Sequence, residues 1–218
     1  MEYIHNTEQF QFHNTVVALG KFDGMHKGHQ LIFDELIQYK QLGYQAAVFS
    51  FDRPPLNMLK HKHMRVIYTT NEKIKLLARR GIDIYIEHPF TDEFSHLSPE
   101  DFVIKVLLEK TGMKVLVVGD DCGFGYKRQG NVELLERMSK EYDFKLIVIP
   151  KLELEGEIVS STRIRHLLSE GKVEEANRLM EDPFMICGSV VHGNHMGAEV
   201  LQMPYFRTNS SLRNLSFP

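Results

Sequence analysis

The chain has 218 residues, 43% of them hydrophobic and 25% charged, which suits one α/β domain with a small appendage. Its 26 basic and 29 acidic residues leave a net charge of −3, so neither a nucleic-acid partner nor a membrane surface is expected. The two distant cysteines make no disulfide framework or zinc site, and the N-terminus lacks a signal-peptide pattern, so we expect a cytoplasmic protein.

Short apolar runs that favour β-structure alternate with amphipathic helical stretches along most of the chain. The apolar runs predict strands at residues 15–19, 45–51, 82–87, 114–118 and 144–149. The helical stretches are residues 28–42, 69–81, 131–142, 161–169 and 173–180. This alternation predicts a parallel sheet with helices on both faces, in which ligands bind outside the carboxyl ends of the strands.

Two helix starts carry recognisable capping patterns. Thr69 and Glu72 form the pattern of a capping box, in which each side chain accepts from the other residue's backbone N–H. Residues 98–101, Ser-Pro-Glu-Asp, place an N-cap serine before a proline and two acids. A further helix is therefore expected to begin at this serine and lead to the strand at 114–118.

The strongest functional signal is the Gly-rich turn at residues 20–29, where the first strand ends and the first helix begins. Its three glycines let the backbone turn sharply and let a phosphate approach the main chain. The helix start adds unpaired N–H groups and a positive dipole end. His26 and His29 are three residues apart, so they can face the same side and donate to phosphate oxygens. The turn predicts a site that stabilises a phosphate during substitution, whereas a zinc site would need a third protein ligand.

Two further segments carry features of a binding site. Three hydroxyl side chains and two arginines gather at the helix start over residues 160–165, and cations there oppose the helix dipole and favour an anion. The loop at 119–131 combines glycines and acids with Phe124 and Tyr126, which can pack against a flat ring. Each segment alone also fits a plainer interpretation, an ordinary serine N-cap and a surface loop. Cys122 is interpreted as a small buried residue, because no base is evident to activate its thiol.

In this order, the three segments resemble the bacterial FAD synthetase family, whose usual member joins an FMN adenylyltransferase module to a riboflavin kinase module. The resemblance covers roughly residues 12–192. It implies an α/β fold of the Rossmann-like nucleotidyltransferase type, followed by a short irregular C-terminal tail. It also implies a reaction in which the phosphate of FMN attacks the α-phosphorus of ATP, giving FAD and pyrophosphate without a covalent enzyme intermediate. Mg²⁺ would arrive with ATP and bridge its phosphates, with no metal site of the protein's own.

The resemblance also implies roles for the matching residues. His26 and His29 would be the catalytic residues, holding the ATP phosphates and the developing charge. The residues that would bind ATP are Gly20, Phe22, Asp23, Gly24, Gly28, Ser160, Ser161, Thr162 and Arg163. The residues that would bind FMN are Phe51, Asp121, Phe124 and Arg128.

The sequence departs from the family pattern in two loops near the expected site. Arg53-Pro54-Pro55 stands where the family usually shows a proline, a variable residue and a second proline. In the loop after the strand at 114–118, Cys122 stands where the family usually shows a phenylalanine. We expect this replacement to loosen the packing around the flavin. His61 and His63, just beyond the prolines, are interpreted as a solvated stretch.

A third departure concerns the end of the chain. Residues 188–193 look like the first strand of the kinase module, but Ala198 then stands for an expected arginine and Tyr205 for an expected threonine. We therefore divide the chain into an adenylyltransferase domain, residues 1–183, and a remnant of the start of a kinase domain, residues 184–218.

The remnant is expected to lack riboflavin kinase activity. A six-stranded barrel needs roughly 60 residues or more, and the segment 184–218 has 35. We expect residues 184–191 to form an orphan strand that packs against the main domain or pairs with a second chain.

Two other interpretations of the function stay open. Another nucleotidyltransferase of this fold, acting on a different phosphate-bearing acceptor, would use the same phosphate motifs, because these contact the nucleotide and not the acceptor. The second open interpretation is a non-catalytic regulator that binds a flavin or a nucleotide, although the intact His26 and His29 argue against it. We expect a monomer or a weak homo-oligomer.

Overall fold

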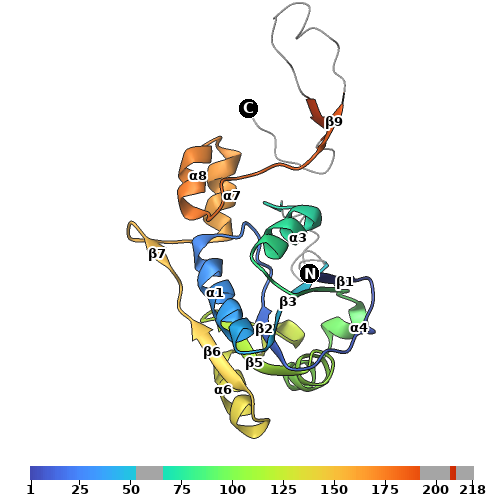
Figure 1. Cartoon of the computed structure of the whole chain (residues 1–218). Helices are drawn as coiled ribbons and strands as arrows, with labels where there is room; N and C mark the ends of the chain where they lie inside the picture. The colour runs from blue at the N-terminus through green and yellow to red at the C-terminus, as the bar shows by residue number, and fades with distance from the viewer. Residues whose placement is uncertain (53–65, 192–206, 210–218) are drawn as a thin grey trace, which may run out of the picture.

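A computed structural model describes residues 1–52, 66–191 and 207–209, and a six-stranded parallel sheet lies at the centre of this described part (Figure 1). The strand order is β1-β4-β3-β2-β5-β6. The strands are β1 (Glu2–His5), β2 (Thr15–Leu19), β3 (Gln45–Phe51), β4 (Ile84–His88), β5 (Met113–Gly119) and β6 (Lys145–Ile149).

The direction of the chain across the sheet reverses at β2. From β2 the chain moves outward through β3 to β4, and it then returns to place β5 on the other side of β2. Ala18 of β2 pairs with Val117 of β5, so the carboxyl ends of these two strands lie side by side. Open α/β sheets bind their ligands outside the strand ends at such a reversal. The loops after β2 and β5 are therefore in position to form a site.

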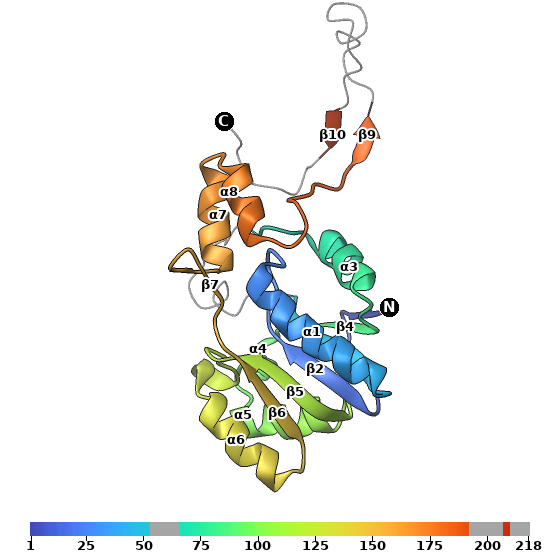
Figure 2. The same cartoon turned by 60° about the vertical axis from the view of Figure 1, so that its left-hand side comes forward.

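Helices cover both faces of the sheet (Figure 2). The core on the first side of the sheet includes residues of α1 (Lys27–Gln41), α3 (Thr70–Arg79), α7 (Ser161–Ser169) and α8 (Val173–Leu179), and α7 and α8 lie beyond the end of the sheet, near the start of α1 (Figure 2). The second side carries α4 (Asp92–Ser95), α5 (Pro99–Asp101), the π-helix η1 (Phe102–Leu108) and α6 (Val132–Glu141). Within β2, Val16 faces the first layer and Val17 the second, which is why the strand is apolar throughout. The predicted α/β class and layering are confirmed.

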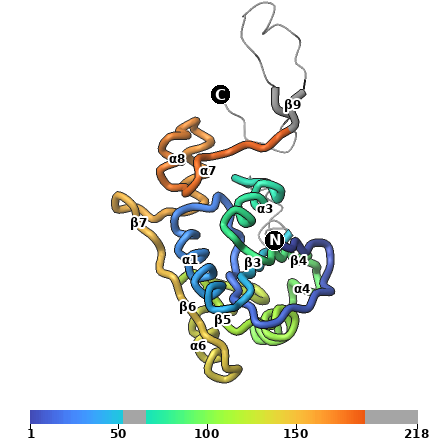
Figure 3. The backbone as a smooth tube through the Cα atoms, viewed as in Figure 1, coloured from blue at the N-terminus to red at the C-terminus, as the bar shows by residue number. Residues whose placement is uncertain are grey.

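Shorter elements lie outside the central sheet. β7 (Glu153–Leu154) pairs with β8 (Glu157–Ile158), and β9 (Ser189–Val191) pairs with β10 (Arg207–Asn209), both antiparallel. The 3₁₀ turn η2 (Tyr126–Arg128) interrupts the loop after β5. Figure 3 shows the chain leaving α8 and running away from the sheet toward β9. In the residues described here, no helix combines the length and the apolar character that crossing a bilayer requires.

Local capping signals formed as predicted. The Thr69 hydroxyl accepts from the Glu72 N–H, and the Glu72 carboxylate accepts from the Thr69 N–H at 2.9 Å, which completes the capping box. The Ser98 hydroxyl accepts from the Asp101 N–H at 3.0 Å, and α5 then continues directly into η1. The bounds of β2, β3 and α7 are those predicted.

The predicted strand at 184–191 is wrong in its extent. The ladder holds only the three residues of β9, and they pair with β10 of the same chain. Before β9, backbone donors bond to side chains: the Phe184 N–H to Asn177 and the Cys187 N–H to Glu72, both at 2.7 Å. These bonds take the donors out of any ladder, while the Phe184 side chain packs against the core under α3 and α8, as expected.

Several elements had no counterpart in the prediction. β1, α4 and the β7–β8 hairpin are short and carry charged residues, so they lack a clear periodic signal. The departures predicted at Arg53-Pro54-Pro55, Ala198 and Tyr205, and the stretch at 61–63, lie outside the described residues.

Candidate active site

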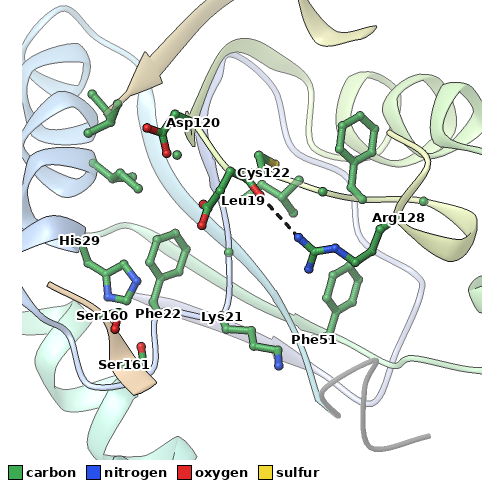
Figure 4. Close-up of a pocket in the computed structure, with 18 of the residues that line it drawn as sticks. Leu19, Lys21, Phe22, His29, Phe51, Asp120, Cys122, Arg128, Ser160 and Ser161 are labelled. Carbon is green, nitrogen blue, oxygen red and sulfur yellow. Dashed lines mark hydrogen bonds between the residues drawn. The ribbon is translucent and has the colours of Figure 1, made fainter. Parts of the chain in front are cut away.

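A cavity of about 940 Å³ opens at the reversal of the sheet. Leu19, Phe51, Gly119 and Ile149, at the carboxyl ends of β2, β3, β5 and β6, line it (Figure 4). Its turn end is formed by the Gly-rich turn and the start of α7. Its aromatic end is formed by the end of β3 and by the loops after β4 and β5.

The Gly-rich turn holds an unusual backbone. Phe22, Gly24 and Met25 have φ values of 50°, 82° and 43°, in the left-handed region that side-chain-bearing residues rarely adopt. Phe22 and Met25 are buried, with 3% and 7% of their surface exposed, so core packing offsets the strain. A Cβ on Gly20 would lie 2.9 Å from the Phe22 ring, so only glycine fits where the ring folds back. The turn is thus fixed by the core beneath it.

His26 and His29 lie at the start of α1. His26 is the N-cap, and the two rings stack with centroids 3.5 Å apart. Burial lowers the pKa of His26 to about 4, and burial together with the neighbouring His26 lowers the pKa of His29 well below its usual value. Both imidazoles are therefore neutral at pH 7, and each has one N–H to donate.

Each of the two stacked rings has one nitrogen that is not hydrogen-bonded. Among the described residues, no group hydrogen-bonds the buried Nδ1 atom of His26 or that of His29. The two histidines are brought together as predicted, and both line the cavity.

The start of α7 lies beside the Gly-rich turn. Ser160 is the N-cap of α7 and accepts from the Arg163 N–H at 3.2 Å. The Ser161 hydroxyl donates to the backbone carbonyl of Asp23 at 2.5 Å. Ser160, Ser161 and Thr162 all line the cavity, so two helix starts, with their positive dipole ends, meet at the turn end.

The Asp23 carboxylate joins the turn to the rest of the first layer. One oxygen accepts from the Ile67 and Tyr68 N–H groups at 2.9 and 3.3 Å, and the other pairs with the Arg165 guanidinium at 2.8 Å. Neither Asp23 nor Gly24 lines the cavity. In this structure Asp23 therefore joins the turn to α7 through Arg165, which lies 142 positions later and was not among the predicted site residues.

Arg163 also does not line the cavity. Its guanidinium pairs at 2.7 Å with the carboxylate of Glu157 in β8. The Glu157 side chain is 66% exposed, so this ion pair is weak and open to exchange. Arg163 is thus near the turn end but is held by the β7–β8 hairpin.

The aromatic end depends on a strained loop. Gly125, Lys127 and Arg128 have φ values of 68°, 51° and 59°. Phe124 exchanges backbone hydrogen bonds with Gly130, where a Cβ would lie 2.6 Å from the Phe124 ring. The loop brings both the Phe124 ring and the Arg128 guanidinium to the cavity.

Polar groups at the aromatic end are largely engaged with one another. The Arg128 guanidinium donates to the Asp121 carbonyl at 3.5 Å, and the Asp121 carboxylate pairs with Lys151 at 3.2 Å. Burial raises the pKa of the Cys122 thiol to about 11, so it stays protonated at neutral pH and is no nucleophile. Cys122 is half-buried in the wall, in keeping with its interpretation as a packing residue.

The cavity gathers most of the predicted site residues and adds others. Those that line it are Gly20, Phe22, His26, Gly28, His29, Phe51, Asp121, Phe124, Arg128, Ser160, Ser161 and Thr162. The loop after β4, which follows a strand end where a ligand is expected, adds Phe90, Phe94 and His96, and none of these three was predicted as a site residue. The signal that points to them is their place after a parallel strand. In the described residues, no three His, Cys, Asp or Glu side chains gather to hold a metal ion.

Comparisons with known proteins agree with this geometry. The model of the family described as FAD synthetase matches residues 8–163. A bifunctional riboflavin kinase/FMN adenylyltransferase of Buchnera aphidicola subsp. Schizaphis graminum is 38% identical over 96% of this chain and 67% of its own. An FAD synthetase of Listeria monocytogenes is 32% identical over 92% of this chain and 83% of its own.

A solved structure and the lengths of the relatives complete the comparison. A Streptococcus pneumoniae crystal structure described as a macrolide-efflux protein is 30% identical, with a TM-score of 0.79, over 90% of this chain and 65% of that one. The chain spans 62–67% of the length of the bifunctional relatives from Buchnera, Listeria and Escherichia coli.

Proposed function

This chain belongs to the FAD synthetase family of nucleotidyltransferases, and from that premise we propose that it transfers the adenylyl group of ATP to FMN. The products are FAD and pyrophosphate. The observation that carries the proposal is the two-ended cavity, with hydrogen-bond donors at the turn end and aromatic rings at the aromatic end. ATP phosphates suit the first, and a flavin ring suits the second.

The reaction is a direct displacement at phosphorus. An oxygen of the FMN phosphate forms a bond to the α-phosphorus of ATP, while the bond from that phosphorus to the α–β bridging oxygen breaks. Pyrophosphate leaves with the bonding electron pair, and no covalent enzyme intermediate forms. Such transfers depend on positioning and on electrostatic stabilisation of the phosphoryl oxygens.

The turn end supplies that stabilisation. His26 and His29, both neutral, offer N–H donors from the start of α1. The start of α7 adds the hydroxyl groups of Ser160 and Thr162 beside its free backbone N–H groups. Because these donors are fixed by the core and by Asp23, they need no reorganisation as charge develops. Mg²⁺ bound to the incoming ATP would help to neutralise the charge of its phosphates.

The aromatic end would hold the isoalloxazine ring. Phe51 and Phe124 present apolar rings from β3 and from the loop after β5, and Arg128 presents a cation at the same end (Figure 4). Flat rings stack on such side chains, and the guanidinium can lie over a ring or bond its carbonyl groups.

The proposal also covers the end of this chain. We take residues 184–218 as the remnant of the start of a kinase module, and we expect the purified 218-residue chain to form no FMN from riboflavin and MgATP. One observation supports this expectation: in the described residues, β9 and β10 form a sheet of two strands and not a barrel.

One assay tests the proposed function. The chain is incubated with MgATP and, separately, with FMN, riboflavin and other phosphorylated acceptors, while pyrophosphate and dinucleotide products are followed. FAD and pyrophosphate are expected from FMN alone. Pyrophosphate released with another acceptor and not with FMN would move the assignment to that acceptor, and no turnover with any of them would favour a binding protein.

A further inference from the structure

Lys21 occupies the boundary between the two ends of the cavity. It follows Gly20 in the Gly-rich turn, and it lines the cavity. In Figure 4 it lies between the group formed by Ser160 and Ser161 and the ring of Phe51. A side chain in this position is within reach of whatever joins the flavin ring to the nucleotide phosphates.

Lys21 differs from the other cations of the cavity in having no partner. Lys151 pairs with a carboxylate at 3.2 Å, Lys127 lies 5.0 Å from the centre of an aromatic ring, and Arg128 donates to a carbonyl group. Within the described residues, no ion pair or hydrogen bond engages the Lys21 ammonium. The other residues of the cavity wall therefore leave this cation available.

The charges around Lys21 make it a cation that lacks a counterion. Burial, followed by the charges of Arg165, Arg128 and Lys73, lowers the pKa of Lys21, while Asp23 raises it. The Asp23 carboxylate is already shared between Arg165 and two backbone N–H groups. An anion that entered the cavity would meet an excess of positive charge at this point.

We propose that the Lys21 ammonium binds the phosphate group of the acceptor and holds it against the α-phosphorus of ATP. This inference rests on the proposed function, and it adds a residue that distinguishes a phosphorylated acceptor from its unphosphorylated form. The acceptor phosphate is the group that must lie between the flavin ring and the ATP phosphates, which is the place of Lys21. A cation there also reduces the repulsion between two anionic phosphates as they approach.

Binding measurements on matched flavins test the proposal directly. FMN and riboflavin share a ring and differ by the phosphate, so the ratio of their dissociation constants isolates the phosphate contribution. Both are titrated by flavin fluorescence into wild type, Lys21→Met, Lys21→Gln and Lys21→Arg. Lys75→Met, on the exposed side of α3, is the control for the change in net charge.

The expected result is a selective loss. Lys21→Met and Lys21→Gln weaken FMN binding about 10- to 100-fold, the range for losing a hydrogen bond to a charged group, and leave riboflavin binding unchanged. Lys21→Arg recovers part of the loss because it keeps the charge, and Lys75→Met changes neither flavin. MgATP binding without flavin changes less than about threefold in every variant, since the turn end keeps its other donors.

Three results would overturn the proposal. Equal weakening of FMN and riboflavin would mean that Lys21 shapes the cavity and does not bind the phosphate. If MgATP binding were weakened and FMN binding were intact, Lys21 would bind the nucleotide and not the acceptor phosphate. If the wild-type chain bound MgATP but neither flavin, the proposed function would be wrong, and so would the proposal for Lys21.

Discussion

At the turn end of the cavity, main-chain turns and helix starts present the binding groups, whereas at the aromatic end side chains from separate loops present them. The turn end is fixed from below by the buried Phe22 and Met25 and from the side by Asp23. The aromatic end instead has an exposed ion pair, Lys151–Asp121, among the groups that surround it. We infer that the turn end holds its binding groups in a fixed geometry, whereas the aromatic end binds its ligand through the shape of the cavity. Changes at the turn end should therefore alter turnover and folding, and changes at the aromatic end should alter flavin affinity.

The largest effect is expected for His29→Ala. Removing one fixed donor to developing charge typically lowers turnover by about 10²–10³, while the helix N–H groups still bind ATP. Steady-state rates of FAD formation and MgATP binding by calorimetry measure the two quantities. Phe51→Leu, at the aromatic end, should instead raise the KM for FMN with turnover largely kept. If Phe51→Leu lost turnover and His29→Ala did not, the division between the two ends would be wrong.

The second prediction separates the folding role of Asp23 from a role in ATP binding. Asp23→Ala leaves the Arg165 guanidinium and two backbone N–H groups without their partner, so we expect a loss of about 3 kcal/mol in the free energy of unfolding. Urea denaturation measures it. Asp121→Ala, whose side chain is 69% exposed at the aromatic end, should cost less than about 0.5 kcal/mol. A stable Asp23→Ala protein that no longer bound ATP would show that Asp23 is a ligand.

The sequence predicted what depends on local patterns. The apolar run of β2, the Thr69 capping box and the serine cap of α7 are each encoded within a few residues, and each formed as expected. The meeting of the two phosphate motifs was also predictable, because both follow strands whose carboxyl ends share one edge.

The remainder depends on contacts between residues that are distant in the chain. Tertiary packing sets two ion pairs, Asp23 with Arg165 and Arg163 with Glu157. No spacing in the sequence predicts these pairs. The first part of the predicted strand at 184–191 did not form for the same reason: Glu72, 115 residues earlier, accepts from the N–H of Cys187.

The third prediction concerns the stability of the folded chain at acidic pH. His26 has a pKa of about 4 in the folded chain against 6.5 when unperturbed, so the unfolded state takes up the proton first as the pH falls. Its contribution to stability is complete above pH 6.5 and is lost as the pH falls toward 4. Between pH 7 and 5, wild type should lose about 2 kcal/mol more than His26→Gln. Urea titrations at a series of pH values measure this slope, and an unchanged slope in His26→Gln would contradict the assignment.

The smallest effect is expected for Arg163→Lys, at the margin of the turn end. Arg163 is held by Glu157, and because that ion pair is largely exposed, a triphosphate can take the guanidinium at little cost. An arginine binds two phosphate oxygens through its planar fork, whereas a lysine offers a point charge, so the KM for MgATP should rise about three- to tenfold. FMN binding should change little. Glu157→Gln releases Arg163 from its resting partner, and the KM for MgATP should then stay equal or fall. If calorimetry showed that Arg163→Lys loses FMN binding while its use of MgATP is intact, the start of α7 would bind the flavin and not the nucleotide. The ligands assigned to the two ends of the cavity would then have to be exchanged.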